Sequence, residues 1–170
     1  MLITLKIFKR RTVIRDFFQT PFFLSVTVGV PFCLFKILFG ILTIRVGLNQ
    51  GNYPQIMAGI FIIIWATTDL LMNLIRAIFD LTGQSNALEY CSLAELGRVF
   101  NAQTVFLALD TLITFSIICF VLWSGWIIHL TRPESYVWYF ATTLNLISLS
   151  LVTLWNEAKR YRSQDKDHKI

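Results

Sequence analysis

The sequence predicts an all-α, multi-pass integral membrane protein that folds as a four-transmembrane-helix bundle. Four apolar stretches, at residues 22–46, 54–79, 104–130 and 136–156, each reach the roughly 20 residues that a helix needs to cross about 30 Å of hydrocarbon. Hydrophobic residues make up 55% of the 170 residues and charged residues only 15%. A soluble domain carries about 25% charged residues. We therefore expect one transmembrane domain, residues 21–158, to occupy most of the chain.

Residues 1–20 form a basic segment in front of the first apolar stretch. Apolar positions within it, such as Ile7, Ile14 and Phe17, recur at helical spacing among lysines and arginines. This pattern predicts a short amphipathic helix on the membrane interface, with a frayed basic flank as the alternative. Pro21 follows, and because proline suits the first turn of a helix, we expect the first span to begin there.

Three segments join the predicted spans. Residues 47–53 are rich in glycine and asparagine and predict a compact turn, and a tighter turn is expected around residues 132–134. The longer middle segment, residues 81–103, contains Ser-Leu-Ala-Glu over residues 92–95, which predicts a capping box in which the serine caps the helix and the glutamate reaches back. A helix beginning there either runs into the third span or stops at the membrane surface, where a docking role is the functional alternative.

Two further features refine the predicted spans. Pro31 lies inside the first span, where it removes a backbone hydrogen bond and predicts a kink. Aromatic residues also cluster around the outer ends of the third and fourth spans, where such side chains form a belt at the membrane interface. These residues are Trp126, Tyr136, Trp138 and Tyr139.

The distribution of basic residues predicts that both termini and the middle segment face the cytoplasm. Of the 15 lysines and arginines, 12 lie in or beside these parts of the chain, one (Lys36) lies within a span, and two lie at the opposite ends of the spans. Those two are Arg45 and Arg132. An even number of spans also puts both termini on one side. Residues 159–170 are accordingly predicted to form a basic cytoplasmic tail.

The net charge of +5 is interpreted as a consequence of this topology and of attraction to anionic lipid headgroups. Membrane lipids are the expected partners. Nucleic acid is not, because the basic residues lie at helix ends rather than on a soluble face. No cofactor is predicted, since the spans lack paired histidines for a haem and the three cysteines form no Cys-x-x-Cys motif. A lipid bound between the helices is compatible with the sequence.

Each predicted span carries small or polar residues on one helical face, at spacings of three, four and seven residues. In membrane bundles such faces meet, because small residues allow close packing and polar residues hydrogen-bond across helices. The candidate polar or ion-pathway residues on these faces are Lys36, Asp69, Asn73, Arg76, Asp110, Thr114 and Asn145. For Arg76, the expected partner is Asp80, one helical turn further along the same span.

Lys36, Asp69 and Asp110 are the ionisable residues of most interest inside the spans. A charge near the bilayer centre costs about 2.5–3.5 kcal/mol, so each should face the bundle and have a partner. At about 1.5 Å per residue the two aspartates can share a layer roughly 9–15 Å from the cytoplasmic edge, with the lysine about 6 Å from Asp69 in depth. The preferred hypothesis pairs Lys36 with Asp69, while Asp110 hydrogen-bonds across helices. The alternatives are a snorkelling lysine, a proton relay, and a cation site that includes Asn73 and Thr114.

The sequence favours a protein without catalytic chemistry. It contains no P-loop, no His-Glu-x-x-His, no Gly-x-Ser-x-Gly and no dinucleotide fingerprint. The leading hypothesis is a small membrane scaffold or accessory subunit that assembles with itself or with a larger membrane complex, because the loops are short and the helix faces are small and polar. The alternative is an oligomeric ion channel or proton-coupled transporter in which Lys36, Asp69 and Asp110 line a pathway. An intramembrane enzyme acting on lipids ranks third.

Overall fold

The structure, a computed structural model, describes residues 21–81 and 91–167, and every regular element in these ranges is a helix. Among the described residues, four helices are long and apolar enough to cross a membrane, at Phe22–Gln50, Tyr53–Asp80, Gln103–Trp123 and Arg132–Ala158. The predicted all-α class and the predicted number of helices of transmembrane length are thereby confirmed. The interfacial helix predicted at residues 1–20 lies outside the described residues.

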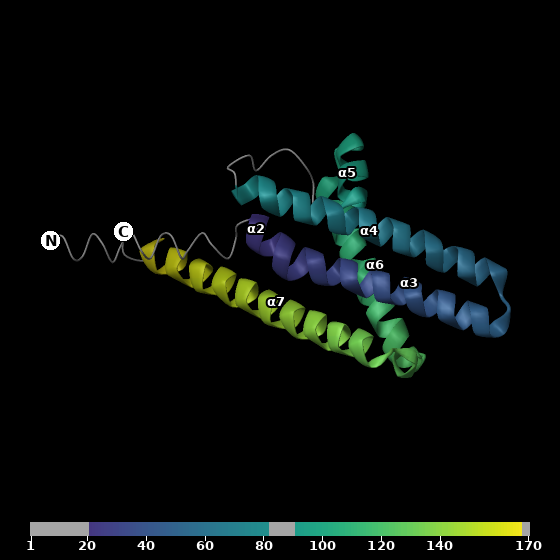
Figure 1. Ribbon diagram of the computed structural model, residues 1–170. Coiled ribbons are helices and arrows are strands. Elements are labelled where there is room, and N and C mark those ends of the chain that lie inside the picture. Colours follow the sequence, from purple (N-terminus) through teal and green to yellow (C-terminus); the bar gives the residue numbers. More distant parts are fainter. Residues whose placement is uncertain (1–20, 82–90, 168–170) are drawn as a thin grey trace.

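The elements follow one another through a helical bundle (Figure 1). In chain order they are α2 (Pro21–Leu24), the π-helical segment η1 (Ser25–Gly29), α3 (Val30–Gln50), α4 (Tyr53–Leu81), α5 (Ser92–Val99), α6 (Gln103–Trp123), the 3₁₀ turn η2 (Trp126–His129) and α7 (Arg132–Asp167). The segments α2, η1 and α3 are continuous and form the first long helix.

The first long helix contains a π-helical turn, η1, which ends two residues before Pro31. The backbone N–H of Val30 donates to the carbonyl of Ser25, five residues earlier instead of four. Proline has no N–H and its ring crowds the carbonyl four residues before it, and a wider π turn relieves that crowding. Where the sequence predicted a kink at Pro31, the structure thus shows a π-helical turn.

Helices α3 and α4 form an antiparallel hairpin with close backbone contact. Gly51 ends α3 in the left-handed conformation, at φ +65°, and its N–H donates to the carbonyls of Gly47 and Leu48. Further along, Gly40 of α3 faces Gly59 of α4. A Cβ atom on Gly59 would lie 2.8 Å from the carbonyl oxygen of Gly40, so the two backbones meet where neither residue has a side chain.

Helix α3 lies at the centre of the bundle and packs against α4, α6 and α7. Figure 1 shows α4 and α7 on either side of α3, whereas α6 crosses these helices at a steep angle in that view. The start of α2 and the end of α7 lie at one end of the bundle, and the α3–α4 turn and η2 lie at the other (Figure 1).

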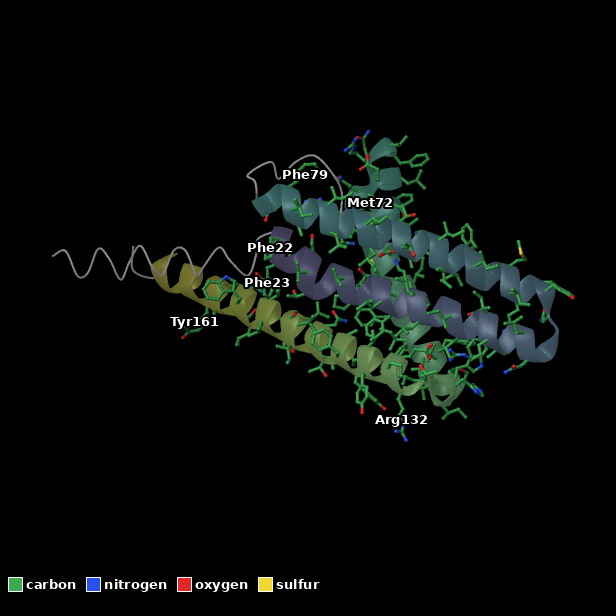
Figure 2. All side chains as sticks on the ribbon, in the orientation of Figure 1. Phe22, Phe23, Met72, Phe79, Arg132 and Tyr161 are labelled. Carbon is green, nitrogen blue, oxygen red and sulfur yellow. The ribbon has the colours of Figure 1, made fainter. Side chains whose placement is uncertain are left out.

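The end of the bundle that holds α2 is fastened by a side-chain cap. Figure 2 places Phe22 and Phe23 of α2 at this end, together with Phe79 of α4 and Tyr161 of α7. The backbone N–H of Phe22 donates to Oδ2 of Asp80 at 2.8 Å. Because the first N–H groups of a helix have no partner within the helix, this contact satisfies one of them and ties α2 to the end of α4.

The apolar core lies where α3 meets α6 and α7. Phe35 and Leu42 of α3 are fully buried, and Trp138 of α7 packs edge-on against Phe35, with 5.0 Å between the ring centroids. Trp138 is only 2% exposed, so its assignment to an outer aromatic belt is wrong. Tyr136 and Tyr139 lie on other faces of the same helix and are exposed. Helix rotation therefore separates a core tryptophan from its tyrosine neighbours.

The connection between α6 and α7 begins earlier than predicted. Helix α6 ends at Trp123, whereas the sequence predicted a span as far as residue 130. The reason is local: Gly125 adopts the left-handed conformation, at φ +74°, and the 3₁₀ turn η2 follows it. Glycine tolerates this conformation without steric cost, which suits it to ending a helix.

Helix α7 also differs from the prediction at both ends. Residues 132–134, expected to form a turn, are its first helical residues. Pro133 suits that first turn, and Glu134 accepts the backbone N–H of Thr131 at 2.7 Å. The helix then runs on through most of residues 159–170, the segment predicted as a tail.

An arginine–glutamate pair fastens the end of the bundle that holds η2. The guanidinium of Arg45 makes two hydrogen bonds to the Glu134 carboxylate, at 3.0 and 2.8 Å, and donates to the carbonyl of His129. Such bidentate pairs combine charge with fixed geometry. The contact joins α3 to the start of α7 and gives the arginine of the first long helix a specific partner.

Candidate functional site

Lys36, Asp69 and Asp110 meet in one buried ion cluster, called the triad below. The Nζ atom of Lys36 lies 3.1 Å from Oδ2 of Asp69 and 2.5 Å from Oδ1 of Asp110. The three side chains come from α3, α4 and α6, and each residue is at most 5% exposed. The predicted pairing of Lys36 with Asp69 is confirmed. The snorkelling alternative is wrong, because two carboxylates hold the ammonium group inside the bundle.

Trp65 and Ser92 complete the surroundings of the triad. The Nζ atom of Lys36 lies 4.7 Å from the centroid of the Trp65 ring, within the range of a cation–π contact. The indole N–H of Trp65 donates to Oγ of Ser92 at 2.8 Å, and that hydroxyl donates to Oδ1 of Asp69 at 2.6 Å. The backbone N–H of Ser92 donates to the same Asp69 oxygen at 2.8 Å. Both carboxylate oxygens of Asp69 therefore accept hydrogen bonds.

The capping box predicted for α5 does not form. Ser92 is the first residue of the helix rather than its cap, because its hydroxyl is bonded to Asp69. Cys91 is the N-cap instead, and its Sγ atom accepts the N–H of Ala94 at 3.4 Å. Glu95, the other residue of the predicted box, instead forms an ion pair with Arg98, three residues further along α5. The motif correctly marks a helix start but assigns the serine to the wrong role.

Helix α5 is separate from α6. It ends at Val99, and Asn101 adopts a positive φ of 51° before α6 begins at Gln103. The two helices then fold against each other, since a Cβ atom on Gly97 would lie 2.8 Å from Cβ of Phe106. Of the two predicted courses for this helix, continuation into the third span is excluded.

Two of the predicted polar residues, Asn73 and Thr114, lie beside the triad. Asn73 is 2% exposed, and its Nδ2 donates to the backbone carbonyl of Asp69 at 3.0 Å and lies 3.7 Å from Sγ of Cys33. Its Oδ1 has no hydrogen-bond partner among the described residues. Thr114 is fully buried and donates its hydroxyl to the backbone carbonyl of Asp110 at 2.9 Å, so it supports the helix rather than the carboxylate.

The remaining predicted residues, Arg76 and Asn145, lie on α4 and α7. Arg76 is half-buried, one helical turn beyond Asn73. Its expected partner Asp80 accepts the backbone N–H of Phe22, as described above. Asn145 is 3% exposed, and within the described part of the chain its Oδ1 has no hydrogen-bond partner. The structure therefore brings a subset of the predicted residues together around Lys36 and leaves Asn145 outside the triad.

The triad contains one lysine and two carboxyl groups. With all three ionised it carries a net charge of −1, and two close carboxylates disfavour joint ionisation. Over residues 21–81 and 91–167, no three His, Cys, Asp or Glu side chains are grouped so that they could hold a metal ion. The arrangement is suited to holding α3, α4 and α6 in one register, and the third member, Asp110, also lines a cavity.

Sequence reasoning did not find Trp65 or Ser92 as parts of this site. Trp65 carried a usable signal, since it lies one helical turn before Asp69 and so shares its helical face. Ser92 carried none, because it lies 23 positions after Asp69 in the chain and only the tertiary fold brings the two together.

No family model, curated protein or solved structure matches this chain in sequence or fold comparison. The functional conclusions below therefore rest on the residues and the geometry of the chain itself.

Proposed function

We propose that the chain is a multi-pass membrane scaffold or accessory subunit, which associates through α7 with a second copy of itself or with a larger membrane assembly. The observation that carries this proposal is a set of exposed hydroxyl groups on α7. Thr143, Ser150 and Thr153 are exposed, and none of their hydroxyls makes a hydrogen bond to another described residue. They lie among exposed apolar side chains, including Leu146 and Leu154.

Two other exposed hydroxyls in the bundle behave differently, whereas the exposed hydroxyl of Thr67 on α4, like those on α7, makes no hydrogen bond to another described residue. Thr68 of α4 and Ser116 of α6 are exposed, yet each donates to the carbonyl four residues earlier in its own helix, at 3.0 and 2.9 Å. A hydroxyl without a partner in hydrocarbon favours association, because a neighbouring helix can supply the missing hydrogen bond. The outer face of α7 is thus chemically suited to pack against another transmembrane helix.

The triad supports the same proposal from inside the bundle. A buried polar network in which the members satisfy one another fixes a single arrangement of the elements that contribute to it. Here Asp69 alone connects α3 through Lys36 and α5 through Ser92. A rigid bundle with an unpaired outer face is the form expected of a scaffold.

Co-purification in a mild detergent tests this proposal. The wild-type chain should be recovered in a discrete assembly of fixed stoichiometry, measured by native mass spectrometry. The variant T143V/S150A/T153V should shift toward monomer. The control T68V/S116A, which removes exposed hydroxyls bonded to their own backbone, should assemble like the wild type. A wild-type chain that is monomeric after extraction from its native membrane would contradict the proposal.

The alternative is a proton-coupled transporter or an oligomeric channel, and one observation favours it. Asp110 belongs to the triad and also lines a cavity of about 230 Å³, so a carboxyl group joins the buried charges to a space that a solute can enter. Reconstituted liposomes provide the test. Proton or ion flux that is present in the wild type and lost in D69N and D110N would establish this alternative, and flux at background would exclude it.

We further propose that both chain termini face the cytoplasm. The proposal rests on the 12 basic residues near the termini and middle segment, against two at the other side. Single cysteines introduced into a cysteine-free variant test it. In intact cells a membrane-impermeant maleimide should label N49C, at an exposed position in the last turn of α3, and leave R160C near the end of α7 unlabelled until the membrane is opened. The reverse labelling pattern would show that both termini lie outside the cytoplasm.

A further inference from the structure

An apolar cavity of about 230 Å³ lies beside the triad, within the half of the bundle that holds α2. Its walls come from α2, η1 and α3 of the first long helix, and from α4, α6 and α7. The apolar part of the wall is formed by Leu24, Val28, Phe32, Leu107, Leu149 and Val152. A cavity of about 150 Å³ accommodates benzene, so this one has room for a six-membered ring with a short substituent.

Two polar side chains, Asn73 and Asp110, are among the residues that line the cavity. Asn73 lines it, is 2% exposed, and has an Oδ1 atom without a hydrogen-bond partner among the described residues. The Nδ2 atom of the same amide is engaged by the Asp69 carbonyl, which leaves the oxygen as the free end. Gly29 makes room for this oxygen, because a Cβ atom there would lie 2.2 Å from it.

Asp110 lines the same cavity, and with the triad fully ionised its carboxylate adds negative charge beside Asn73. Its Oδ1 is held by Lys36, but that lysine is shared with Asp69, so two carboxyl groups face one ammonium. An unpaired buried acceptor and an excess of carboxylate both favour a hydrogen-bond donor that carries positive charge. An anionic headgroup would meet repulsion at the same place.

From these observations we propose that the cavity binds a lipophilic amine, with its apolar body between η1, α6 and α7 and its protonated amino group at Asn73 and Asp110. The amino group supplies the donor that Oδ1 of Asn73 lacks and offsets the excess negative charge of the triad. This inference is independent of the scaffold role proposed above.

Three matched probes test the proposal on the full-length protein in detergent: 2-phenylethylamine, 2-phenylethanol and propylbenzene. These molecules share the apolar ring and differ in the head. Isothermal titration should give the amine the highest affinity, about tenfold above the alcohol, with propylbenzene weakest, because charge-assisted hydrogen bonds are stronger than neutral ones. Equal affinity for the amine and propylbenzene would overturn the polar half of the proposal.

Variants place the probe in the cavity. V152F fills the cavity from the α7 wall and should abolish binding of 2-phenylethylamine, whereas L151F, at the exposed neighbouring position, should leave it unchanged. D110N should reduce the preference for the amine over the alcohol. If D110N does not fold, N73L supplies the test of the polar contacts, since it removes the free acceptor. Binding that survives V152F, or no binding by the wild type up to the solubility of the amine, would contradict the site.

Discussion

Ser92 contacts Asp69 twice, through its backbone N–H and through its hydroxyl, and both hydrogen bonds end on the same carboxylate oxygen. The other oxygen of Asp69 accepts from Lys36. One aspartate of α4 therefore holds the lysine of α3 on one side and the first residue of α5 on the other. The start of α5 is thus fixed in the bundle by a charged contact.

Removing the Ser92 hydroxyl should therefore destabilise the protein more than removing the glutamate charge of the predicted capping box. S92A deprives the Trp65 indole N–H and Asp69 of a partner, which costs about 1–3 kcal/mol when the groups are buried. E95Q alters a partly exposed ion pair and should change stability by less than about 0.5 kcal/mol. Unfolding by SDS titration in mixed micelles measures both. A larger destabilisation by E95Q than by S92A would instead support the predicted capping box.

Replacing Lys36 with methionine should strongly destabilise the bundle. K36M leaves two buried carboxyl groups without their shared cation, and breaking a buried ion pair in this way costs about 3–5 kcal/mol. The triple variant K36M/D69N/D110N removes all three charges and should recover part of that loss in the same SDS titration. R98M, which removes an exposed cation, is the control and should stay near the wild type. Equal losses in the single and triple variants would show that charge is not the cause.

The two aspartates of the triad should respond differently to amidation. Both carboxylate oxygens of Asp69 accept hydrogen bonds, one from Lys36 and the other twice from Ser92. D69N replaces one of these oxygens with an NH₂ group, which would then face a hydrogen-bond donor instead of accepting from it. D110N keeps a neutral pair of Lys36 with Asp69 and removes the excess negative charge. We expect D69N to be less stable than D110N by about 1–3 kcal/mol, measured by thermal unfolding in detergent. The opposite order would mean that Asp110 is the principal partner of Lys36.

The contact between Gly40 and Gly59 predicts sensitivity to a single added methyl group. In G59A the new Cβ would lie 2.8 Å from the Gly40 carbonyl oxygen and 2.6 Å from a side-chain atom of Ile44, so α3 and α4 must separate. Overpacking of this kind costs about 1–3 kcal/mol. A58V places its added methyl groups at the exposed preceding residue and should have little effect in the same SDS titration. If both variants are equally stable, the helices do not meet at this point.

Cys91 should react slowly with maleimides in the folded protein. Burial, and next the negative charge of Asp110, raise the pKa of its thiol to about 12. At pH 8 only about one such thiol in ten thousand is ionised, and the thiolate is the reactive form. In the variant C33A/C119A, labelling of Cys91 should be slow in mild detergent, should speed up as pH rises toward 11, and should be fast after unfolding in SDS. Rapid labelling of the folded protein would place Cys91 at the surface.

The buried charges illustrate how much of the site follows from sequence. Lys36, Asp69 and Asp110 stood out because charges inside apolar stretches are costly and must face a partner. Helical rise then gave the approximate depth of each, which sufficed to pair Lys36 with Asp69. It did not show that Lys36 serves both aspartates, since rotation and tilt of α6 decide whether Asp110 reaches the lysine.

The sequence by itself determined the all-helical class of this protein, its four helices of transmembrane length and the charged residues within them that would be costly to expose to an apolar solvent. These properties depend on composition and local periodicity, which are present in any short window of the chain. Only the tertiary structure decided that the Ser92 hydroxyl donates to Asp69 instead of capping α5, that Trp138 lies in the core, and that Asn73 and Asp110 line the same cavity. Those outcomes depend on contacts between residues far apart in the chain, which helix packing creates and local sequence does not encode.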